Sequence, residues 1–428
     1  MLISFKIKNY RSFKDELIFS LEADSSKLKT QNVADVPISN NSNLRVLKMA
    51  MIYGANASGK SNLIRAFFNL VRFILAKPNV GERVEMYEPF LFDINTKRSD
   101  AKFEIDFITN SVKHTYCVIF NAEKIVEETL FSFPNSRQKI LFTRSSDTEQ
   151  DSNIHTGILG SDLGNKKIKI FNNQLLLSKF GSDEPIAELT AIYLYFKNYD
   201  VINSENTSYR RTYIQKEVSE ILYKNEILKN KMDSLLTFAD TKLKAVSIQE
   251  NKDAPAPDGI KRGNISNGYS LFGVHPLYDN SIYTGSDQQL SFNQESVGTQ
   301  VLFSLGGKVL LTLENGGVLI VDEMDVSLHP FLTRMIILMF QSDKLNPQNA
   351  QLIFTSHDMT LLDRDLVRRD QVWITQKNEN GASEMFSIQD FDGVREETPF
   401  DKWYLAGKFG GLPSLKSIDL MFENESAS

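Results

Sequence analysis

The eight residues from Gly54 to Ser61 read GANASGKS and fit the pattern G-x-x-x-x-G-K-[ST] of a phosphate-binding loop, or P-loop. Glycines permit the tight backbone bend and the close approach to a phosphate, because they carry no Cβ. The N–H groups of such a bend form an anion site in front of a helix N-terminus. Lys60 would place its charge on the β- and γ-phosphates, and Ser61 would offer its hydroxyl to Mg²⁺. The motif therefore predicts a nucleotide site.

The residues on either side of the loop have the strand and helix patterns that a P-loop requires. Residues 46–53 read VLKMAMIY, typical of a buried strand, and residues 62–76 read NLIRAFFNLVRFILA, a helical pattern that ends before Pro78. A chance glycine-rich turn is the alternative, and these flanks make it the weaker interpretation. The loop residues that we expect to bind the nucleotide are Gly54, Asn56, Ser58, Gly59, Lys60, Ser61 and Asn62.

Composition narrows the class of protein. The chain has 428 residues, of which 41% are hydrophobic and 24% charged, as in ordinary globular proteins of about two or three domains. Its net charge of −6 gives no overall basic field for nucleic acid. One cysteine allows no disulfide framework. With neither a signal-peptide pattern nor an apolar run long enough for a membrane span, we expect a soluble, cytoplasmic protein.

An aliphatic run that ends in two acidic residues lies downstream. Residues 317–323 read GVLIVDE, which fits a strand buried on both faces of a parallel sheet. Asp322 would then lie at the carboxyl end of the strand and hold Mg²⁺, the Walker B role, while Glu323 could act as general base for the attacking water. Alone, the run could equally be a strand with an acidic turn. The P-loop upstream favours the catalytic interpretation.

Two further stretches fit the same site. Residues 351–358 read QLIFTSHD, so His357 follows a buried strand shortly after Walker B, and it is the only one of the five histidines in such a place. A histidine there could hydrogen-bond the γ-phosphate and orient water. Residues 295–300 read ESVGTQ before a helical run, which puts Ser296 and Gly298 at an anion-binding helix N-terminus. An ordinary helix cap is the local alternative.

The rest of the chain divides by its hydrophobic pattern. Residues 2–8 alternate like a half-buried strand, and 22–44 are turn-rich, which predicts a loop. Four period-two segments predict an antiparallel meander: 101–109, 113–121, 124–133 and 138–143. Further expectations are a loop at 144–165, mostly helix at 184–248 and an exposed loop at 251–267. We expect three parts: 1–145, with the P-loop and an antiparallel lobe; 146–268, a mostly helical insertion; and 269–428, with the remaining motifs.

The order P-loop, Ser-x-Gly, Walker B and histidine resembles that of ABC-type ATPases. The opening ISFKIKNYRSFKD and the extended Walker B, DEMDVSLHP, resemble the SMC, RecF and OLD branch of AAA-type ATP-binding proteins. YLAGKFGGLP near the C-terminus resembles the close of RloA/AbiL-type abortive-infection ATPases. The resemblance implies an α/β fold of the ABC type (SMC/RecF-like), with an antiparallel lobe, a parallel P-loop sheet core and a helical insertion.

The resemblance also implies roles for matching positions. The cofactors would be ATP and Mg²⁺, with Ser61 and Asp322 assisting the metal and Glu323 acting as the base. Ser296 and Gly298 would form the signature that contacts ATP held by a second subunit, in a head-to-tail homodimer or a higher oligomer. His357 would be the switch, and Arg11 and Ser12 would lie near the nucleotide.

Two departures from the family pattern stand out. ABC proteins carry a glutamine after the P-loop helix, and the candidate stretch, residues 84–95 (VEMYEPFLFDIN), has none. SMC proteins have an aspartate where this chain has His329. These two positions leave the completion of the metal site and the link between subunits open.

The resemblance implies a role in defence against phage by abortive infection. The ATPase would be the sensor or regulator of a separately encoded effector, such as a Toprim or other nuclease. OLD proteins carry a Toprim domain of their own, and the stretch after His357 is too short for one, so we expect a partner. One alternative is a RecF/SMC-like DNA-repair ATPase, with DNA as partner. Another is an ATP-locked scaffold that sequesters a toxin.

Overall fold

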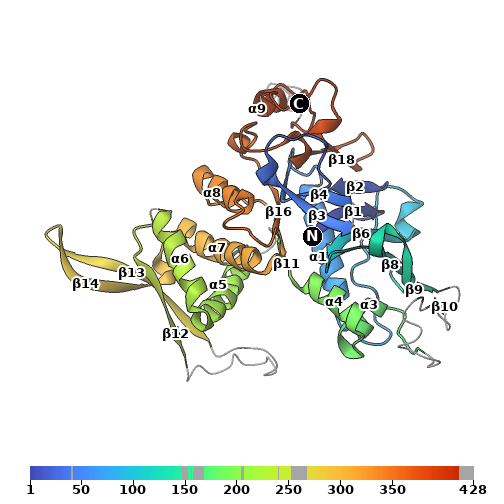
Figure 1. Ribbon diagram of the computed structural model, residues 1–428, viewed down its shortest axis with the longest axis horizontal. Coiled ribbons are helices and arrows are strands. Elements are labelled where there is room, and N and C mark those ends of the chain that lie inside the picture. The colour runs from blue at the N-terminus through green and yellow to red at the C-terminus, as the bar shows by residue number, and fades with distance from the viewer. Residues whose placement is uncertain are drawn as a thin grey trace, which may run out of the picture.

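Two sheets lie on either side of helix α1 (Lys60–Leu75), which follows the P-loop (Figure 1). The computed structural model describes residues 1–39, 42–146, 153–155, 157, 168–203, 207–239, 241–251 and 268–413. The apolar residues of α1 pack against both sheets. Phe67 of α1, for example, lies 4.3 Å from Phe5 of the antiparallel sheet, measured between ring centroids. The predicted helix after the P-loop is confirmed.

The antiparallel sheet has seven strands in the order β10-β9-β8-β7-β6-β1-β2. Their bounds are β1 Leu2–Lys8, β2 Leu17–Ser20, β6 Ala101–Thr109, β7 Val112–Phe120, β8 Ile125–Ser132, β9 Lys139–Ser145 and β10 Asn153–His155. The first predicted strand and the meander are confirmed. The expected loop at 144–165 is wrong at β10, which extends the sheet by pairing with β9. Most of the rest of that stretch lies outside the described residues.

The core sheet has six strands in the order β11-β15-β16-β5-β17-β18. Their bounds are β5 Met49–Gly54, β11 Tyr199–Ile202, β15 Val318–Val321, β16 Gln351–Thr355, β17 Val372–Lys377 and β18 Ser383–Ser387. All neighbours pair in parallel except β17 and β18. The aliphatic runs are explained by burial on both faces: Ala50 and Ile52 pack in one core, and Met49 and Met51 in the other.

The predicted strand at 46–53 is two strands. Strand β4 (Ser42–Leu47) ends one residue before β5 begins, and Lys48 lies between them. The Lys48 side chain is buried for almost its whole length and its amine contacts Asp343 at 2.7 Å. A buried lysine needs such a partner, because an unpaired charge is costly in the protein interior.

Helices cover the second face of the core sheet (Figure 1). These helices are α5 Thr207–Lys224, α6 Glu226–Phe238, α7 Val297–Asn315, α8 Pro330–Gln341 and α9 Phe400–Leu405, whereas α3 Leu176–Ser178 and α4 Ala187–Lys197 pack in the same core as α1. Short helical turns are η1 Thr30–Asn32, η2 Thr96–Arg98, η3 Pro134–Ser136, η5 Lys179–Asp183, η6 Phe292–Gln294, η7 Met359–Leu361, η8 Arg369–Gln371 and η9 Ile388–Asp390. None of the helices in the described ranges combines the length and apolarity needed to cross a membrane.

The segment 184–248, expected to be mostly helical, contains α4, α5 and α6 but also two strands. Strand β11 pairs in parallel with β15, so it belongs to the core sheet. Strand β12 (Ala245–Glu250) belongs to a three-stranded sheet with β13 (Tyr269–Asp279) and β14 (Ile282–Ser291). Both strands are short, and their pairing with distant residues decides their conformation. Most of the expected loop at 251–267 lies outside the described residues, and the division into three parts stays a prediction.

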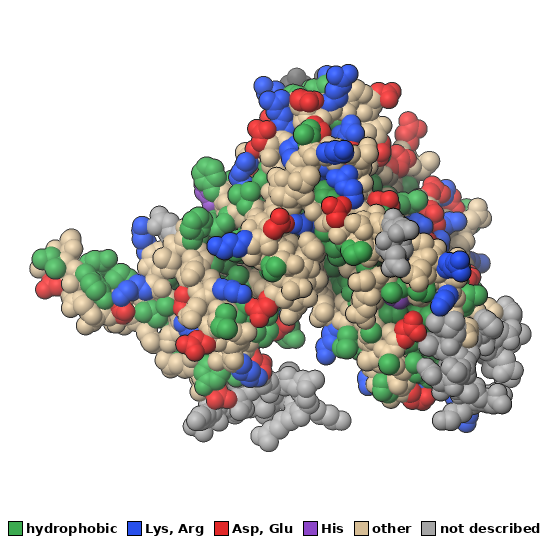
Figure 2. Space-filling model, in the orientation of Figure 1, with side chains coloured by type: hydrophobic (Ala, Val, Ile, Leu, Met, Phe, Trp, Pro, Cys, Tyr) green, Lys and Arg blue, Asp and Glu red, His purple; other side chains and the backbone are tan. Residues whose placement is uncertain are grey.

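The hairpin of β13 and β14 projects from the body of the molecule, at the left of Figures 1 and 2. Asn280 and Ser281 have positive φ angles of 45° and 69°, as a tight two-residue hairpin turn requires. Hydrophobic side chains gather near this turn (Figure 2), and the exposed ones include Leu277, Tyr278, Ile282 and Tyr283.

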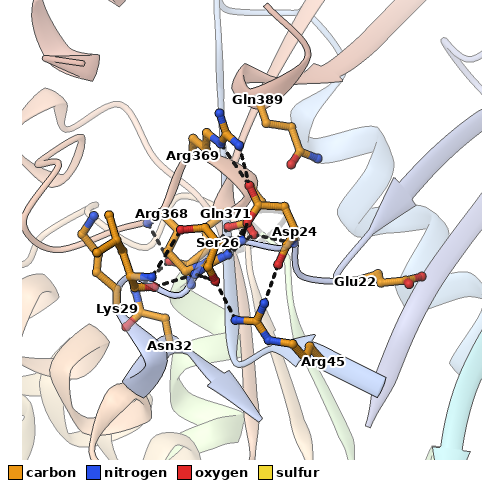
Figure 3. Close-up of polar contacts among 12 residues, drawn as sticks. Glu22, Asp24, Ser26, Lys29, Asn32, Arg45, Arg368, Arg369, Gln371 and Gln389 are labelled. Carbon is orange, nitrogen blue, oxygen red and sulfur yellow. Dashed lines mark hydrogen bonds and ion pairs between the residues drawn. The ribbon is translucent and has the colours of Figure 1, made fainter. Parts of the chain in front are cut away.

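The expected loop at 22–44 is wrong in its second half, where β3 (Val33–Ser39) and β4 form a hairpin. Its first half is anchored by Asp24, which accepts hydrogen bonds from Arg368 at 2.6 Å and Arg369 at 2.9 Å (Figure 3). Burial alone would raise the pKa of Asp24. The hydrogen bond from the Ser26 N–H, together with both arginines, outweighs burial and lowers the pKa. The network joins the N-terminal segment to the turn before β17.

Candidate nucleotide site

The P-loop joins β5 to α1 at the carboxyl edge of the core sheet. Gly54 has φ 150° and Gly59 has φ 122°, and the space for a Cβ is already filled at both positions. A Cβ on Gly54 would overlap the carbonyl oxygen of Thr375, and one on Gly59 would overlap the hydroxyl of Ser383. Both glycines are therefore required by the packing of β17 and β18 against the loop. The loop is held as a cradle of the kind that the sequence motif predicts.

The Lys60 side chain folds back over this cradle. Its amine donates to the carbonyl oxygens of Gly54 at 2.8 Å and Ala55 at 3.1 Å. Burial lowers the pKa of Lys60, although three carboxylates act in the opposite direction. They belong to Asp322, Glu323 and Asp325. A positive charge therefore lies among the P-loop carbonyls and within electrostatic reach of the acidic residues.

Thr355, at the end of β16, positions both acidic residues of Walker B. Its hydroxyl donates to a carboxylate oxygen of Asp322 at 2.7 Å and accepts from the backbone N–H of Glu323 at 2.7 Å. Glu323 has a left-handed φ of 54°, which turns the chain sharply just after β15. Because such a φ is unfavourable for a glutamate, the hydrogen bond to Thr355 helps to hold it. The sequence analysis missed Thr355, although it directly precedes Ser356 and His357.

The turn after Walker B reaches the predicted switch histidine. The backbone N–H of His357 donates to Asp325 at 3.2 Å. The second carboxylate oxygen of Asp325 is buried and has no hydrogen-bond partner among the described residues. His357 itself is exposed and lines a hollow with the P-loop. The structure therefore brings His357 to the loop, as predicted, and adds Asp325 to the site.

The hollow beside the P-loop has a volume of about 690 Å³. Its walls come from the P-loop, from the turn after β16, from the end of β17 and from the segment after α9. The lining residues are Gly54, Ala55, Asn56, Ser58, His357, Met359, Gln376, Lys377, Tyr404, Gly411, Leu412 and Pro413. Asn56 and Ser58 thus lie where the sequence predicts. The contribution of residues 404–413 was not predicted.

Arg11 and Ser12, the two N-terminal residues expected near the nucleotide, lie in different surroundings. Ser12 lies at the P-loop: its hydroxyl accepts from the Asn62 side chain at 2.7 Å, and its carbonyl accepts from the N–H of Ser383 at 2.7 Å. Arg11 instead pairs with Glu88 at 2.9 Å, with both side chains about one-third exposed. Glu88 lies in the stretch 84–95, where the family pattern has a glutamine, and here it pairs with Arg11.

A second small hollow lies beside Walker B. It has a volume of about 180 Å³, and its lining includes Asp322, Glu323, Asn203 and Arg211. Asn203 directly follows β11, whose last residue, Ile202, pairs with Val321. Asn203 is thus a polar side chain at the carboxyl edge next to Asp322, and the sequence analysis missed it. The sequence did contain a signal for Asn203: residues 199–203 read YDVIN, which has the form of a short strand followed by a polar residue.

The Ser-x-Gly signature lies at the N-terminus of α7. The Ser296 hydroxyl accepts from the N–H of Thr299 at 3.1 Å and so caps the helix. Ser296 is exposed, and Gly298 approaches the Walker B turn, since a Cβ there would lie 3.3 Å from the carbonyl oxygen of Ser327. Neither residue is among those that line the hollow at the P-loop. The helix terminus therefore faces outward.

The residues present suit a magnesium nucleotide. No group of three or more acidic, histidine or cysteine side chains within the described ranges is arranged to hold a metal ion alone. Mg²⁺ in nucleotide sites takes one or two protein ligands and completes its shell with phosphates and water. Ser61, exposed at the start of α1, and the carboxylate of Asp322 meet that need. The cradle formed by Gly54 and Gly59 suits the phosphates.

Comparison with known proteins identifies the family. The model of the family described as "AAA domain, putative AbiEii toxin, Type IV TA system" matches residues 49–169 and 191–363. The match covers more than half of the chain, and the chain belongs to this family of AAA domains. A search of curated proteins found no match.

Similar solved structures include two SMC head domains and the recombination mediator protein RecF. The SMC head domain from Thermotoga maritima is 14% identical, with 90% of this chain and 98% of that chain covered and a TM-score of 0.41. The Smc head domain bound to the C-terminal domain of ScpA from Pyrococcus furiosus is 12% identical, with 91% and 96% covered and a TM-score of 0.39. The recombination mediator protein RecF is 14% identical, with 90% and 98% covered and a TM-score of 0.32.

Proposed function

We propose that this protein binds ATP with Mg²⁺ and hydrolyses it. The observation that carries the proposal is that the P-loop, which follows β5, and Asp322 and Glu323, which follow β15, stand at the same carboxyl edge of the core sheet with only β16 between them. The P-loop amides and Lys60 would hold the phosphates, and Glu323 would accept a proton from the attacking water. Mg²⁺, bound with Ser61 and Asp322, would neutralise developing charge on the phosphates. Thr355 and Asp325 would hold the acidic turn and His357 in position.

The exposed signature supports a second part of the proposal, a head-to-tail homodimer. Ser296 and Gly298 stand at a helix N-terminus that faces outward, where its partial positive charge is open to an anion. The P-loop hollow of the same chain has no lining residue from α7. ATP bound in one subunit would therefore receive its last contacts from the signature of the other.

The decisive test of nucleotide binding is Lys60→Ala. Loss of a charge that pairs with phosphate costs on the order of 1.5–3 kcal/mol, so we expect ATP affinity to fall by roughly tenfold or more. Calorimetric titration with ATP measures this affinity. Lys77→Ala serves as the control, because Lys77 lies just beyond α1 and its amine pairs only with Asp183 within the described residues. Wild-type ATP affinity in the Lys60 variant would refute the site.

The dimer is tested by mixing two inactive variants, Lys60→Ala and Ser296→Arg. A mixed dimer contains one site with an intact loop from one chain and an intact signature from the other. We expect part of the ATPase activity to return in the mixture. If a verified heterodimer stays inactive, each site is built within one chain.

For the cellular role, we propose defence by abortive infection, as in the RloA/AbiL-type systems, with a separately encoded effector. The family description, which names a toxin–antitoxin system, and the C-terminal resemblance support this role. DNA repair and an ATP-locked toxin scaffold are the competing roles. Affinity purification from infected and uninfected cells, followed by mass spectrometry, distinguishes them by the partner recovered. A slow single turnover with a stably bound toxin would favour the scaffold.

A further inference from the structure

The segment after α9 is the unexplained part of the site. Residues 404–413 read YLAGKFGGLP, and we call residues 407–413 the C-terminal turn. It follows α9, which lies beside the C label in Figure 1, and although it is far from β5 in the sequence it shares the hollow with the P-loop. The chemistry proposed above assigns it no role.

Close backbone approach fixes the position of this turn. Gly411 has a φ of 69°, and a Cβ there would lie 2.5 Å from the Ile374 side chain and 3.5 Å from the Cα of Gly54. The first of these distances is far below an ordinary contact, so a side chain at Gly411 would push the turn away from β17. The second is an ordinary contact, so Gly411 is required by its packing on Ile374, and this packing holds the turn against Gly54, the first residue of the phosphate cradle.

Two tyrosines connect the turn to the other side of the hollow. The Tyr404 hydroxyl donates to the carbonyl oxygen of Gly411 at 3.1 Å, and its ring lies 5.9 Å from that of Tyr53. Tyr53 directly precedes Gly54 and donates to the carbonyl oxygen of Asp358 at 2.8 Å, next to His357. The turn, the P-loop and the switch segment thus form one contiguous packed unit.

We propose that the C-terminal turn is a wall of the nucleotide site that selects ATP over ADP. The inference rests on the proposed ATPase function. The hollow brings the turn together with the first half of the P-loop and His357, which is the side proposed for the γ-phosphate. A wall there shapes the space of the γ-phosphate, which Lys60 contacts from the other side together with the β-phosphate, and it leaves the α- and β-phosphates to the P-loop amides and the α1 N-terminus. Tyr404 and Gly411 are its positioning residues.

The first test compares two glycine substitutions. Gly411→Ala and Gly393→Ala both place a side chain at positive φ, 69° and 79°, but a Cβ on Gly393 would have no atom within 4 Å. The backbone strain of the two substitutions is thus matched, and they differ only in whether the new Cβ would meet neighbouring atoms. In Gly411→Ala we expect ATP affinity to fall on the order of tenfold or more, because a displaced turn would lose its contact with the γ-phosphate, and one hydrogen bond to a charged group is worth about that factor. ADP affinity should stay within about threefold of the control.

Calorimetry with ATP and with ADP, in a Glu323→Gln background that prevents turnover, gives both affinities. Thermal unfolding without nucleotide records the structural effect of each variant. A lower unfolding temperature with an unchanged ATP-to-ADP affinity ratio would mean that the turn is only structural and would overturn the proposal. If the protein without these glycine changes binds no ATP, or if Lys60→Ala does not weaken binding, the proposed function itself fails.

A milder variant covers the case in which Gly411→Ala does not fold. Tyr404→Phe keeps the ring contact with Tyr53 and removes only the hydrogen bond to Gly411. We expect it to lower the ATP-to-ADP affinity ratio by roughly two- to tenfold, the range for one hydrogen bond. A ratio equal to that of the wild type would contradict the proposed role of Tyr404.

Intrinsic fluorescence gives a direct readout of the turn. Trp403, in α9, has the Lys408 amine 4.0 Å from its ring centroid and Phe409 at 5.9 Å, so its emission depends on the conformation of the turn. The chain has one other tryptophan, Trp373, whose indole N–H is buried without a hydrogen-bond partner, so Trp373→Phe removes that signal and leaves no new orphan. In this background ATP should change the Trp403 emission more than ADP. An equal response to both nucleotides, or none, would overturn the proposal.

Discussion

The hydroxyl of Thr355 offers a sharp test of how Walker B is held. Thr355 is fully buried, and Thr355→Val preserves the shape of its side chain while removing the oxygen. The oxygen donates to Asp322 at 2.7 Å and accepts from the N–H of Glu323 at 2.7 Å. A hydrogen bond to a charged group contributes about 1.5–3 kcal/mol, and a neutral one about 1 kcal/mol. We therefore expect the free energy of unfolding to fall by about 2.5–4 kcal/mol.

The same substitution should slow hydrolysis more than it weakens binding. Without the Thr355 oxygen, the left-handed turn at Glu323 loses the hydrogen bond to its N–H. The Glu323 carboxylate is then no longer held in one position. Misplacement of a catalytic group by about 1 Å can cost about 100-fold in rate. ATP affinity should stay within about threefold, because the P-loop and Lys60 are untouched.

Thr355→Ser is the matched control, since it keeps the oxygen and loses one methyl group, which costs about 1 kcal/mol. Phosphate release at saturating ATP, calorimetric ATP binding and urea unfolding should be measured on both variants below their unfolding temperatures. The reasoning predicts slow turnover in the valine variant and near-normal turnover in the serine variant. If both variants hydrolyse ATP at the wild-type rate, Thr355 does not position the base.

Three further predictions concern Glu323, Gly59 and Asp24. Glu323→Gln should bind ATP normally and hydrolyse it on the order of 10²–10⁴-fold more slowly, as measured by single-turnover phosphate release; an unchanged rate would assign the base elsewhere. Gly59→Ala should abolish ATP binding in calorimetry because its Cβ overlaps Ser383; retained affinity would show that the loop can move aside. The pKa of Asp24 is lowered in the folded state, so its stabilisation is complete above about pH 4 and is lost as pH falls below that. Asp24→Asn should therefore reduce the loss of unfolding free energy between pH 6 and pH 3 in urea titrations, and parallel curves for the two proteins would contradict this.

Local sequence patterns determined the elements that build the P-loop and the strands beside it. Residues 2–8 and 101–109 alternate with period two and form strands with those bounds, because one face of their sheet packs on α1. The GANASGKS motif is similarly local, since a strand, a glycine bend and a helix suffice to build the cradle. The placement of His357 beside that cradle also follows from a parallel sheet, whose strand ends share one edge.

Only the tertiary structure decided which distant residues complete the site. Thr355 holds both acidic residues, Asn203 lies beside Asp322, and Gly411 packs on Gly54 from the far end of the chain. Strand β11 was hidden in a helical pattern because its conformation depends on pairing with β15. Periodicity reports which face of an element is buried, and a motif reports local backbone geometry. Neither contains the three-dimensional register that brings residues far apart in the sequence into contact, which depends on how the sheets and helices pack together.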